Sequence, residues 1–235
     1  MMNTLAQPRA SDYDILSFDC YGTLVDWETA ITSTLQSILL SHDAHWNDAV
    51  LLEHFALLEP AEQEHGGSYR DVLGRVLKQF GTRLGFVPTE SQLIQFEECI
   101  ARAAPFPDTV DALKTLSESF QLAIISNTDD DLFALTAQNL LVSFDYVITA
   151  EQVGLYKPNL AVFEHAVKEF SCSKSRIIHV AQSLFHDVAP ANALGIATAW
   201  IDRTRGKPGA TASSDATPQW TYQTLAELAG TVQDS

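Results

Sequence analysis

The spacing of apolar residues predicts one buried strand followed by a long helical stretch. Residues 13–19, YDILSFD, form a short apolar run that ends near a turn signal at Gly22, which is typical of a buried strand in a parallel sheet. Apolar residues then recur at helical spacing in four successive segments, 27–40, 48–59, 68–80 and 89–102. No strand pattern interrupts residues 27–102.

Capping residues support the boundaries of these helices. Asn47 precedes the second segment and is a good N-cap, and Gly81 follows the third, where glycine commonly ends a helix. Thr89 and Gln92 have the spacing of a capping box, in which each side chain bonds the backbone N–H of the other residue. These signals predict separate helices joined by short loops.

The second half of the chain alternates between helices and strands. Strands are predicted over 121–126, 145–149, 176–180 and 197–201. Helices are predicted over 107–116, 131–139, 159–170 and 190–194. Repeated βα units of this length favour a parallel sheet with helices on both faces, so the predicted fold class is α/β. Residues 204–218, rich in Gly, Ser, Thr and Pro, are predicted to form a surface loop.

The simplest architecture is one α/β core that is interrupted after its first strand by an all-helical insertion. The core would comprise residues 1–26 and 103–235, and the inserted helical cap residues 27–102. Exposed loops whose ends lie close together tolerate such insertions. We therefore expect a parallel sheet with a separate group of helices beside it.

The chain is strongly acidic, and this narrows the range of partners. Of its 235 residues, 14 are Lys or Arg and 30 are Asp or Glu, which gives a formal net charge of −16. Such a field repels nucleic acids and anionic membrane surfaces, so neither is an expected partner. A small anionic substrate remains compatible with the sequence, provided that positive charge and backbone N–H groups gather locally at its site.

Cysteine usage and hydropathy predict a soluble protein of a reducing compartment. The three cysteines, Cys20, Cys99 and Cys172, are few, odd in number and far apart, so they predict neither a disulfide framework nor a zinc site. No stretch approaches 18 consecutive apolar residues, and the first residues lack the order of a signal peptide. We expect a cytoplasmic protein, and a homodimer is compatible with the sequence.

Polar side chains follow several of the predicted strands. Asp19 follows the first strand, Ser126 and Asn127 end the second, and Asp187 comes after a later one. Ligands of parallel sheets bind beyond the carboxyl ends of the strands, so we expect these groups to share one rim with Lys157, which precedes a helix. A lysine beside Asp19 is expected to lower the pKa of that carboxyl and keep it ionised. An ionised, positioned carboxylate can act as a nucleophile and form a covalent ester.

Each of these residues also has a plain structural interpretation. Asp19 is compatible with a turn at the end of a strand, and Asp187 with the N-cap of the helix that follows it. Ser126 and Asn127 are compatible with a turn stabilised by their own side chains. Taken singly, none of them establishes a reactive site, and the order in which they occur decides the interpretation.

Four motifs, in this order, make the chain resemble the haloacid dehalogenase-like (HAD) hydrolase superfamily. They are FDCYGTLVD at 18–26, IISNT at 124–128, LYKPN at 155–159 and VAQSLFHD at 180–187. The resemblance implies a Rossmann-like core with an inserted helical cap, and Asp19 as the nucleophile. It also implies that substrate and charge partners are Thr23, Ser126, Asn127 and Lys157.

Within the superfamily, DCYGTLVDWE at 19–28 is most similar to the type II, L-2-haloacid dehalogenase branch. Phosphatases of the superfamily normally have a second Asp two residues after the nucleophile, which protonates the leaving alcohol. This chain has Tyr21 there, and a phenol with an ordinary pKa of about 10 is a poor equivalent acid near neutral pH. Halide leaves without a proton, so Tyr21 is compatible with cleavage of a carbon–halogen bond.

The last motif bears on the need for a metal. Phosphatases of the superfamily usually place two acids there to hold Mg²⁺, whereas this chain has Asp187 and, five residues earlier, Gln182. No cofactor is expected for dehalogenation. In the phosphatase alternative, Asp19 and Asp187 would hold Mg²⁺, which often uses only one or two carboxylates.

The chain departs from the dehalogenase pattern in its cap and in its last motif. The stretch 47–59 contains no Arg or Lys, where the family has an arginine that receives the halide. Candidate replacements are other basic residues of the cap, namely His42, His45, His54, Arg70 and Arg75. Gln182 and His186 stand where the family has Ser and Trp, and with Tyr21 and Asn127 they are expected to contact the substrate.

The sequence thus predicts a capped α/β hydrolase that acts on small 2-haloacids or related small carboxylates. Asp19 would displace the halide with inversion, Ser126 and loop N–H groups would hold the substrate carboxylate, and Lys157 would fix the charge of the nucleophile. Water activated near Asp187, with His186, would then hydrolyse the ester. The alternatives are a Mg²⁺-dependent phosphatase for a small phosphate ester and a non-catalytic HAD-fold binding protein.

Overall fold

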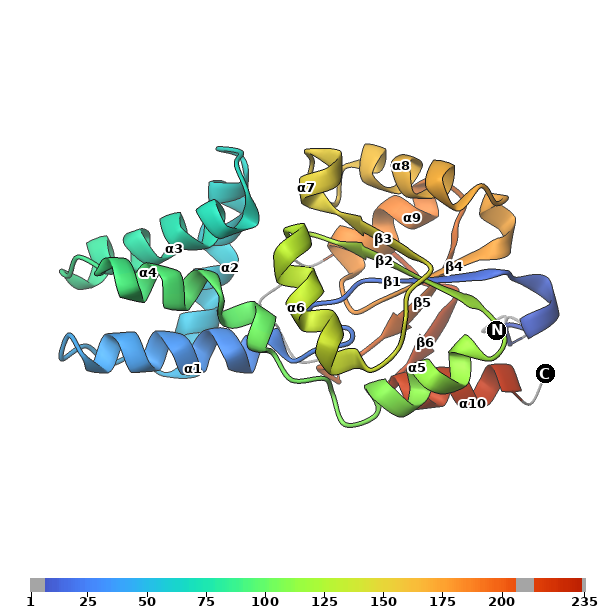
Figure 1. Ribbon diagram of the computed structural model, residues 1–235, viewed down its shortest axis with the longest axis horizontal. Helices are drawn as coiled ribbons and strands as arrows, with labels where there is room; N and C mark the ends of the chain where they lie inside the picture. Colours follow the sequence, from blue (N-terminus) through green and yellow to red (C-terminus); the bar gives the residue numbers. More distant parts are fainter. Residues whose placement is uncertain (1–6, 206–213, 234–235) are drawn as a thin grey trace.

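A six-stranded parallel sheet forms the centre of the computed structural model, which describes residues 7–205 and 214–233 (Figure 1). All neighbouring strands run parallel, in the order β3-β2-β1-β4-β5-β6. The strands are β1 (Ile15–Phe18), β2 (Gln121–Ser126), β3 (Tyr146–Thr149), β4 (Ile177–Ala181), β5 (Ala197–Ile201) and β6 (Trp220–Tyr222). The predicted α/β class is confirmed.

The first strand lies in the interior of the sheet, and the sheet separates the core into two apolar clusters. β1 pairs with β2 on one side and β4 on the other, and all four of its residues are buried. Successive side chains of a strand point to opposite faces. Ile15 accordingly joins the apolar cluster on one face, while Leu16 and Phe18 join the cluster on the other.

Helices cover both faces of the sheet (Figure 1). Above the sheet in this view lie α7 (Ala150–Val153), α8 (Leu160–Phe170) and α9 (Ala189–Ala193). Below it lie α5 (Thr109–Ser117) and α10 (Leu225–Gln233), whereas α6 (Asp130–Leu140) is at the end of the sheet that faces the cap. The chain leaves the sheet for the remaining helices directly after β1, at the carboxyl end of that strand.

Four helices form a group beside the sheet, where the sequence predicts the cap (Figure 1). They are α1 (Trp27–Leu40), α2 (Asp48–Gln63), α3 (Tyr69–Leu84) and α4 (Glu90–Glu97). Asn47 accepts a hydrogen bond from the N–H of Val50, and Thr89 with Gln92 forms a complete capping box, as predicted. Apolar side chains of this group and of the core belong to one continuous cluster, so the two parts pack against each other.

Three predicted helix ends are wrong. The second cap helix, predicted to end at residue 59, continues to Gln63. The third cap helix continues through Gly81 and ends at Gly85, whose φ of +79° is the left-handed conformation that favours glycine. Gly81 is buried within the helix, and glycine is needed there because an added Cβ would lie 2.5 Å from the backbone oxygen of Phe86. The helix predicted over 89–102 is divided into α4 and a 3₁₀ turn, Cys99–Arg102.

Among the α-helices and β-strands of the described residues, β6 (Trp220–Tyr222), α7 (Ala150–Val153) and α10 (Leu225–Gln233) have no counterpart in the sequence prediction. β6 and α7 are only three and four residues long, too short for a periodic pattern to be visible. Of the loop predicted over 204–218, residues 206–213 lie outside the described part of the chain, and 214–218 form neither helix nor strand.

The cap is attached to the core through the N-terminus of α3. The buried Asp129 carboxylate of the core accepts hydrogen bonds from the backbone N–H groups of Tyr69, at 2.7 Å, and Arg70, at 2.9 Å. The Arg70 guanidinium also binds Asp131 at 2.8 Å. N–H groups in the first turn of a helix lack acceptors within the helix. The Asp129 carboxylate of the core therefore supplies the acceptor for two N–H groups of α3.

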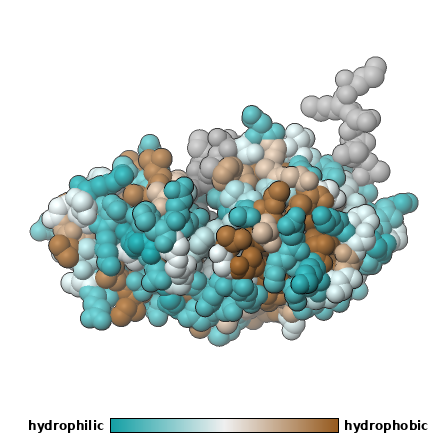
Figure 2. Space-filling model, turned by 90° about the horizontal axis from the view of Figure 1, so that it is seen from above, coloured by the Kyte–Doolittle hydropathy of each residue, from teal (hydrophilic) through white to brown (hydrophobic). Residues whose placement is uncertain are grey.

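The face in Figure 2 is mostly hydrophilic, with smaller hydrophobic areas on the cap and on the core. Exposed large apolar side chains of the described core include Leu155, Leu160 and Phe185. None of the helices in the described ranges is long and apolar enough to cross a membrane.

Candidate active site

Three adjacent strands place the reactive groups at one edge of the sheet. Asp19 follows β1, Ser126 is the last residue of β2, and Asp187 lies in the turn of helix that follows β4. After Asp19 the chain turns at Gly22, whose φ is +92° and where an added Cβ would lie 3.0 Å from Trp27 Nε1. The turn therefore needs glycine, and it directs the chain from the nucleophile position into the cap.

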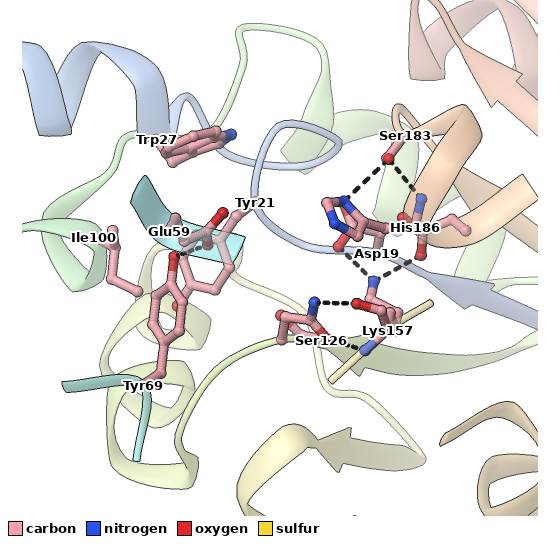
Figure 3. A pocket seen from close by; sticks show the side chains of 12 residues that line it. Asp19, Tyr21, Trp27, Glu59, Tyr69, Ile100, Ser126, Lys157, Ser183 and His186 are labelled. Atoms are coloured by element: carbon pink, nitrogen blue, oxygen red, sulfur yellow. Dashed lines mark hydrogen bonds and ion pairs between the residues drawn. The ribbon is translucent and has the colours of Figure 1, made fainter. Parts of the chain in front are cut away.

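Lys157 joins the two carboxylates (Figure 3). Its Nζ donates to Asp19 Oδ1 at 2.9 Å, to Asp187 Oδ1 at 2.6 Å and to the backbone oxygen of Ile125 at 2.8 Å. The Lys157 and Asp187 side chains are 2% and 1% exposed, and that of Asp19 is 10% exposed. All three donor positions of the ammonium are occupied, and the pair of carboxylates shares one counter-ion.

Burial and charge act in opposite directions on these groups. Burial and the neighbouring charge of Asp187 together raise the pKa of Asp19 more than Lys157 and Thr23 lower it, so the expected lowering of that pKa is wrong in its net direction. Burial also raises the pKa of Asp187, but Lys157 and His179 reverse this and hold the pKa at about 2. Burial lowers the pKa of Lys157, and its two carboxylate neighbours more than offset that. The lysine thus stabilises the charged form of both carboxylates against the effect of burial.

A buried chain of hydrogen bonds holds Asp187 from behind. His179 Nε2 lies 2.9 Å from Asp187 Oδ1, and His179 Nδ1 lies 2.9 Å from Ser17 Oγ on the neighbouring strand. Ser17 and His179 are direct register partners of β1 and β4. The sequence prediction missed both residues. The available signal was a histidine within the otherwise apolar strand RIIHV, where a buried polar side chain requires a partner.

Thr23 orients the nucleophile. Its hydroxyl donates to Asp19 Oδ2 at 2.7 Å and accepts the backbone N–H of Gln182 at 2.8 Å. The side chain of Gln182 does not line the pocket that contains Asp19. It lines a neighbouring cavity with Gly22 and Arg203, so the structure does not place this predicted substrate contact at the nucleophile.

Ser126 and Asn127 differ in whether their side chains already have hydrogen-bond partners within the protein. The Asn127 amide donates to the backbone oxygen of Lys157 at 3.0 Å and accepts the Lys157 N–H at 2.7 Å, so it positions the lysine loop. Ser126 Oγ lines the pocket, is buried, and has no hydrogen-bond partner among the described residues. A buried hydroxyl without a partner is costly, which makes Ser126 the group most ready for a ligand oxygen.

Tyr21 and His186 also line the pocket. Tyr21 Oη lies 2.9 Å from Thr136 Oγ1, and burial raises the pKa of the phenol, so Tyr21 keeps its proton near neutral pH. Burial lowers the pKa of His186, whose Nδ1 lies 3.3 Å from Ser183 Oγ. A neutral imidazole is able to accept a proton, whereas Asp187, with its low pKa, is a weak base.

The cap closes the pocket with a carboxyl group and aromatic rings. Glu59 of α2, Tyr69 of α3 and Trp27 of α1 line it together with Ile100 (Figure 3). The sequence prediction did not single out these residues. One signal was available for Glu59, because it follows Leu51 and Phe55 at four-residue intervals and so falls on the apolar face of its helix.

None of the proposed replacements for the missing cap arginine lines this pocket. Arg70 binds Asp131, and Arg75 binds Glu62 at 3.0 Å. His42 stacks on Phe86 and His54 on Trp46, while His45 is exposed. The structure therefore does not place any of these five residues at the pocket, and four of them have partners within or beside the cap.

The two carboxylates of the magnesium alternative already share a lysine. The ammonium of Lys157 bonds Oδ1 of Asp19 and Oδ1 of Asp187. Gln182 replaces a second acid of the last motif, and its side chain faces another cavity. Within residues 7–205 and 214–233, no three His, Cys, Asp or Glu side chains are grouped as metal ligands.

Comparison with known proteins gives two kinds of relative. The chain is 25% identical over 231 residues to an (S)-2-haloacid dehalogenase of Pseudomonas fluorescens, covering 93% of this chain and 96% of that one. It is 27% identical over 154 residues to a glyceraldehyde 3-phosphate phosphatase of Methanothermobacter thermautotrophicus, covering 64% of this chain and 68% of that one.

A solved structure and a family model also match this chain. The crystal structure of an L-2-haloacid dehalogenase superposes with a TM-score of 0.81 at 21% identity, covering 95% of this chain and all of that one, and thus shares the fold. The family model for haloacid dehalogenase-like hydrolase matches residues 13–195. The chain therefore belongs to the haloacid dehalogenase-like hydrolase family.

Proposed function

We propose that this hydrolase removes halide from small 2-haloacids through an ester of Asp19. The observation that carries the proposal is the pairing of a lysine-bound carboxylate with Tyr21 two residues later. Tyr21 is bonded to Thr136 and retains its proton, so no acid stands ready there to protonate a leaving alcohol. A halide ion needs no such acid, and its departure is compatible with this pocket.

The proposed reaction has two steps. In the first, an oxygen of Asp19 attacks the α-carbon from the side opposite the halogen, and the halide leaves with the bonding electrons. In the second, water attacks the side-chain carbonyl carbon of Asp19 and gives a proton to neutral His186. The 2-hydroxyacid then leaves with that proton, and Asp19 releases the second proton of the water to solvent and is restored as a carboxylate beside Lys157. The net change is replacement of halogen by hydroxyl with release of hydrogen halide.

Ser126 is the proposed anchor for the substrate carboxylate. Replacing it with alanine is expected to raise KM roughly 10- to 100-fold, because a hydrogen bond to a charged group contributes about 1.5–3 kcal/mol. The fold should be unaffected, since Ser126 Oγ has no partner in the described residues. Steady-state kinetics and thermal unfolding measure the two effects. An unchanged KM would remove Ser126 from the proposed binding site.

A phosphatase is the second candidate, and the phosphatase of Methanothermobacter thermautotrophicus among the relatives favours it. Asp19 is equally suited to attack phosphorus, and Lys157 to hold its charge. The absence of an acid at position 21 and the position of Lys157 between the carboxylates weigh against a Mg²⁺-dependent reaction here. A cytoplasmic location and a homodimer stay predictions from the sequence.

The test is halide release from L-2-chloropropionate, with and without EDTA. We expect chloride and a 2-hydroxyacid of inverted configuration, at rates that EDTA leaves unchanged. p-Nitrophenyl phosphate with added Mg²⁺ is the parallel assay. Hydrolysis of that ester without chloride release would favour the phosphatase. Turnover of neither substrate would favour a binding protein without catalytic activity.

A further inference from the structure

The pocket has two ends of different chemistry (Figure 3). Asp19, Lys157 and Ser126 form one end, which provides the nucleophile, a positive charge and the unpartnered Ser126 hydroxyl for an anion. The opposite end is formed largely by the cap and contains Glu59 with three aromatic side chains, those of Tyr21, Trp27 and Tyr69. A ligand that fills the pocket therefore meets a second carboxyl group at its far end.

The Glu59 carboxyl group is held in place but lacks a cationic partner among the described residues that line the pocket. Its Oε1 accepts hydrogen bonds from Tyr69 Oη at 2.7 Å and from Gln63 Nε2 at 3.2 Å. Apart from His186, Lys157 is the only basic side chain lining this pocket in the described ranges, and it binds the carboxylates at the other end. Two neutral donors fix one oxygen of Glu59 and leave its negative charge without a counter-ion.

We propose that the Glu59 carboxylate and the rings around it bind a protonated amino group of the substrate. This inference rests on the proposed function and names the substrate class, a small 2-haloacid with an amine at the end remote from the reacting carbon. An ammonium ion donates charge-assisted hydrogen bonds to a carboxylate, and it is attracted to the faces of Trp and Tyr rings. Carboxylate and aromatic groups together are the chemistry that recognises an organic cation.

The same end of the pocket discriminates against other substituents. A methyl group there offers the partly buried Glu59 neither a hydrogen bond nor a counter-ion, and a second carboxylate is repelled by it. Burial raises the pKa of Glu59, against the opposing effect of the Tyr69 hydrogen bond, as is usual for an acid without a nearby cation. An arriving ammonium supplies that cation.

The test compares reaction-product ligands that differ only at the far end, by titration calorimetry with the wild-type protein. The ligands are 3-amino-2-hydroxypropanoate, 2-hydroxybutanoate and malate, which end in ammonium, methyl and carboxylate. We expect the amino acid to bind at least tenfold more tightly than 2-hydroxybutanoate, and malate to bind most weakly. In Glu59→Gln the first two should bind within about twofold of each other. Glu53→Gln, an exposed acid on the same helix, should keep the wild-type preference.

Two further measurements keep the outcome independent of the proposed reaction. Tyr69→Phe, which removes one bond to Glu59, should reduce the preference for the amine without abolishing it. The pair 2-aminoethyl phosphate and propyl phosphate should show the same preference if the core end prefers phosphate. Chloride release without any amine preference would overturn the amine site and leave the dehalogenase proposal standing. Amine preference without chloride release would overturn the dehalogenase proposal and leave the amine site standing. No binding of any ligand would overturn the amine site.

Discussion

Replacing Asp19 with asparagine is expected to lower turnover by at least about 10⁴-fold, as loss of a catalytic nucleophile does in other covalent hydrolases. The amide is neutral and a poor nucleophile, and it removes one of the two charges that Lys157 bonds. Chloride release from L-2-chloropropionate measures the effect. Asp12→Asn, at an exposed carboxylate remote from the pocket, is the matched control and should retain full activity.

Isotope labelling separates a nucleophile from a base at the same position. In a single turnover in heavy-oxygen water, the hydroxyl of the product should come from Asp19 and carry little label. The label should instead appear in the carboxyl group of Asp19, which mass spectrometry of the digested protein detects. If water attacks the substrate directly, the product is labelled at once and Asp19 stays unlabelled, and the ester mechanism is then wrong.

Replacing Lys157 with methionine is expected to have the second largest effect, on both activity and stability. It removes a buried ammonium and leaves Asp19 and Asp187 adjacent without a counter-ion. Breaking a buried ion pair typically costs about 3–5 kcal/mol of unfolding free energy. The remaining carboxylates should share a proton, so the activity of this variant at neutral pH should be about 10²–10³-fold below that of the wild type. This is approximately the effect of losing one electrostatic group in an active site. Urea unfolding and steady-state kinetics measure the two losses.

A double variant distinguishes this explanation from a general loss of packing. Lys157→Met combined with Asp187→Asn leaves only one charge at the site, so it should recover part of the lost stability while remaining inactive. Lys114→Met, at an exposed lysine of α5, should change neither property. If the double variant is less stable than the single one, repulsion between the two carboxylates is not the cause of the loss.

The elements that position the site could be predicted from the sequence because their patterns are long or strongly periodic. The strand before Asp19, the alternating second half and the four cap helices all have such patterns. The short elements β6 and α7 do not. The end of α3 was misplaced because a glycine mid-helix and a glycine at a helix end look alike in sequence. Gly81 is required by close packing and Gly85 by its backbone conformation.

At the site, what could be predicted was the part contained within short motifs. The motifs bring Asp19, Lys157, Asp187 and Ser126 together, and the structure places all four at one pocket. The cap wall was not predicted, because Glu59 and Tyr69 come from different helices and meet only when these pack. The net direction of the Asp19 pKa was also missed, since it depends on burial, which is a property of the folded chain.

The attachment of α3 to Asp129 has a consequence for the order of events. Tyr69, which bonds Glu59, also gives its backbone N–H to Asp129 of the core. A displacement of the cap from the core would break the Asp129 bonds and would carry Tyr69 and Glu59 away from Asp19 together. The far end of a ligand is thus recognised only while cap and core are docked together, because one residue, Tyr69, connects Glu59 to the core.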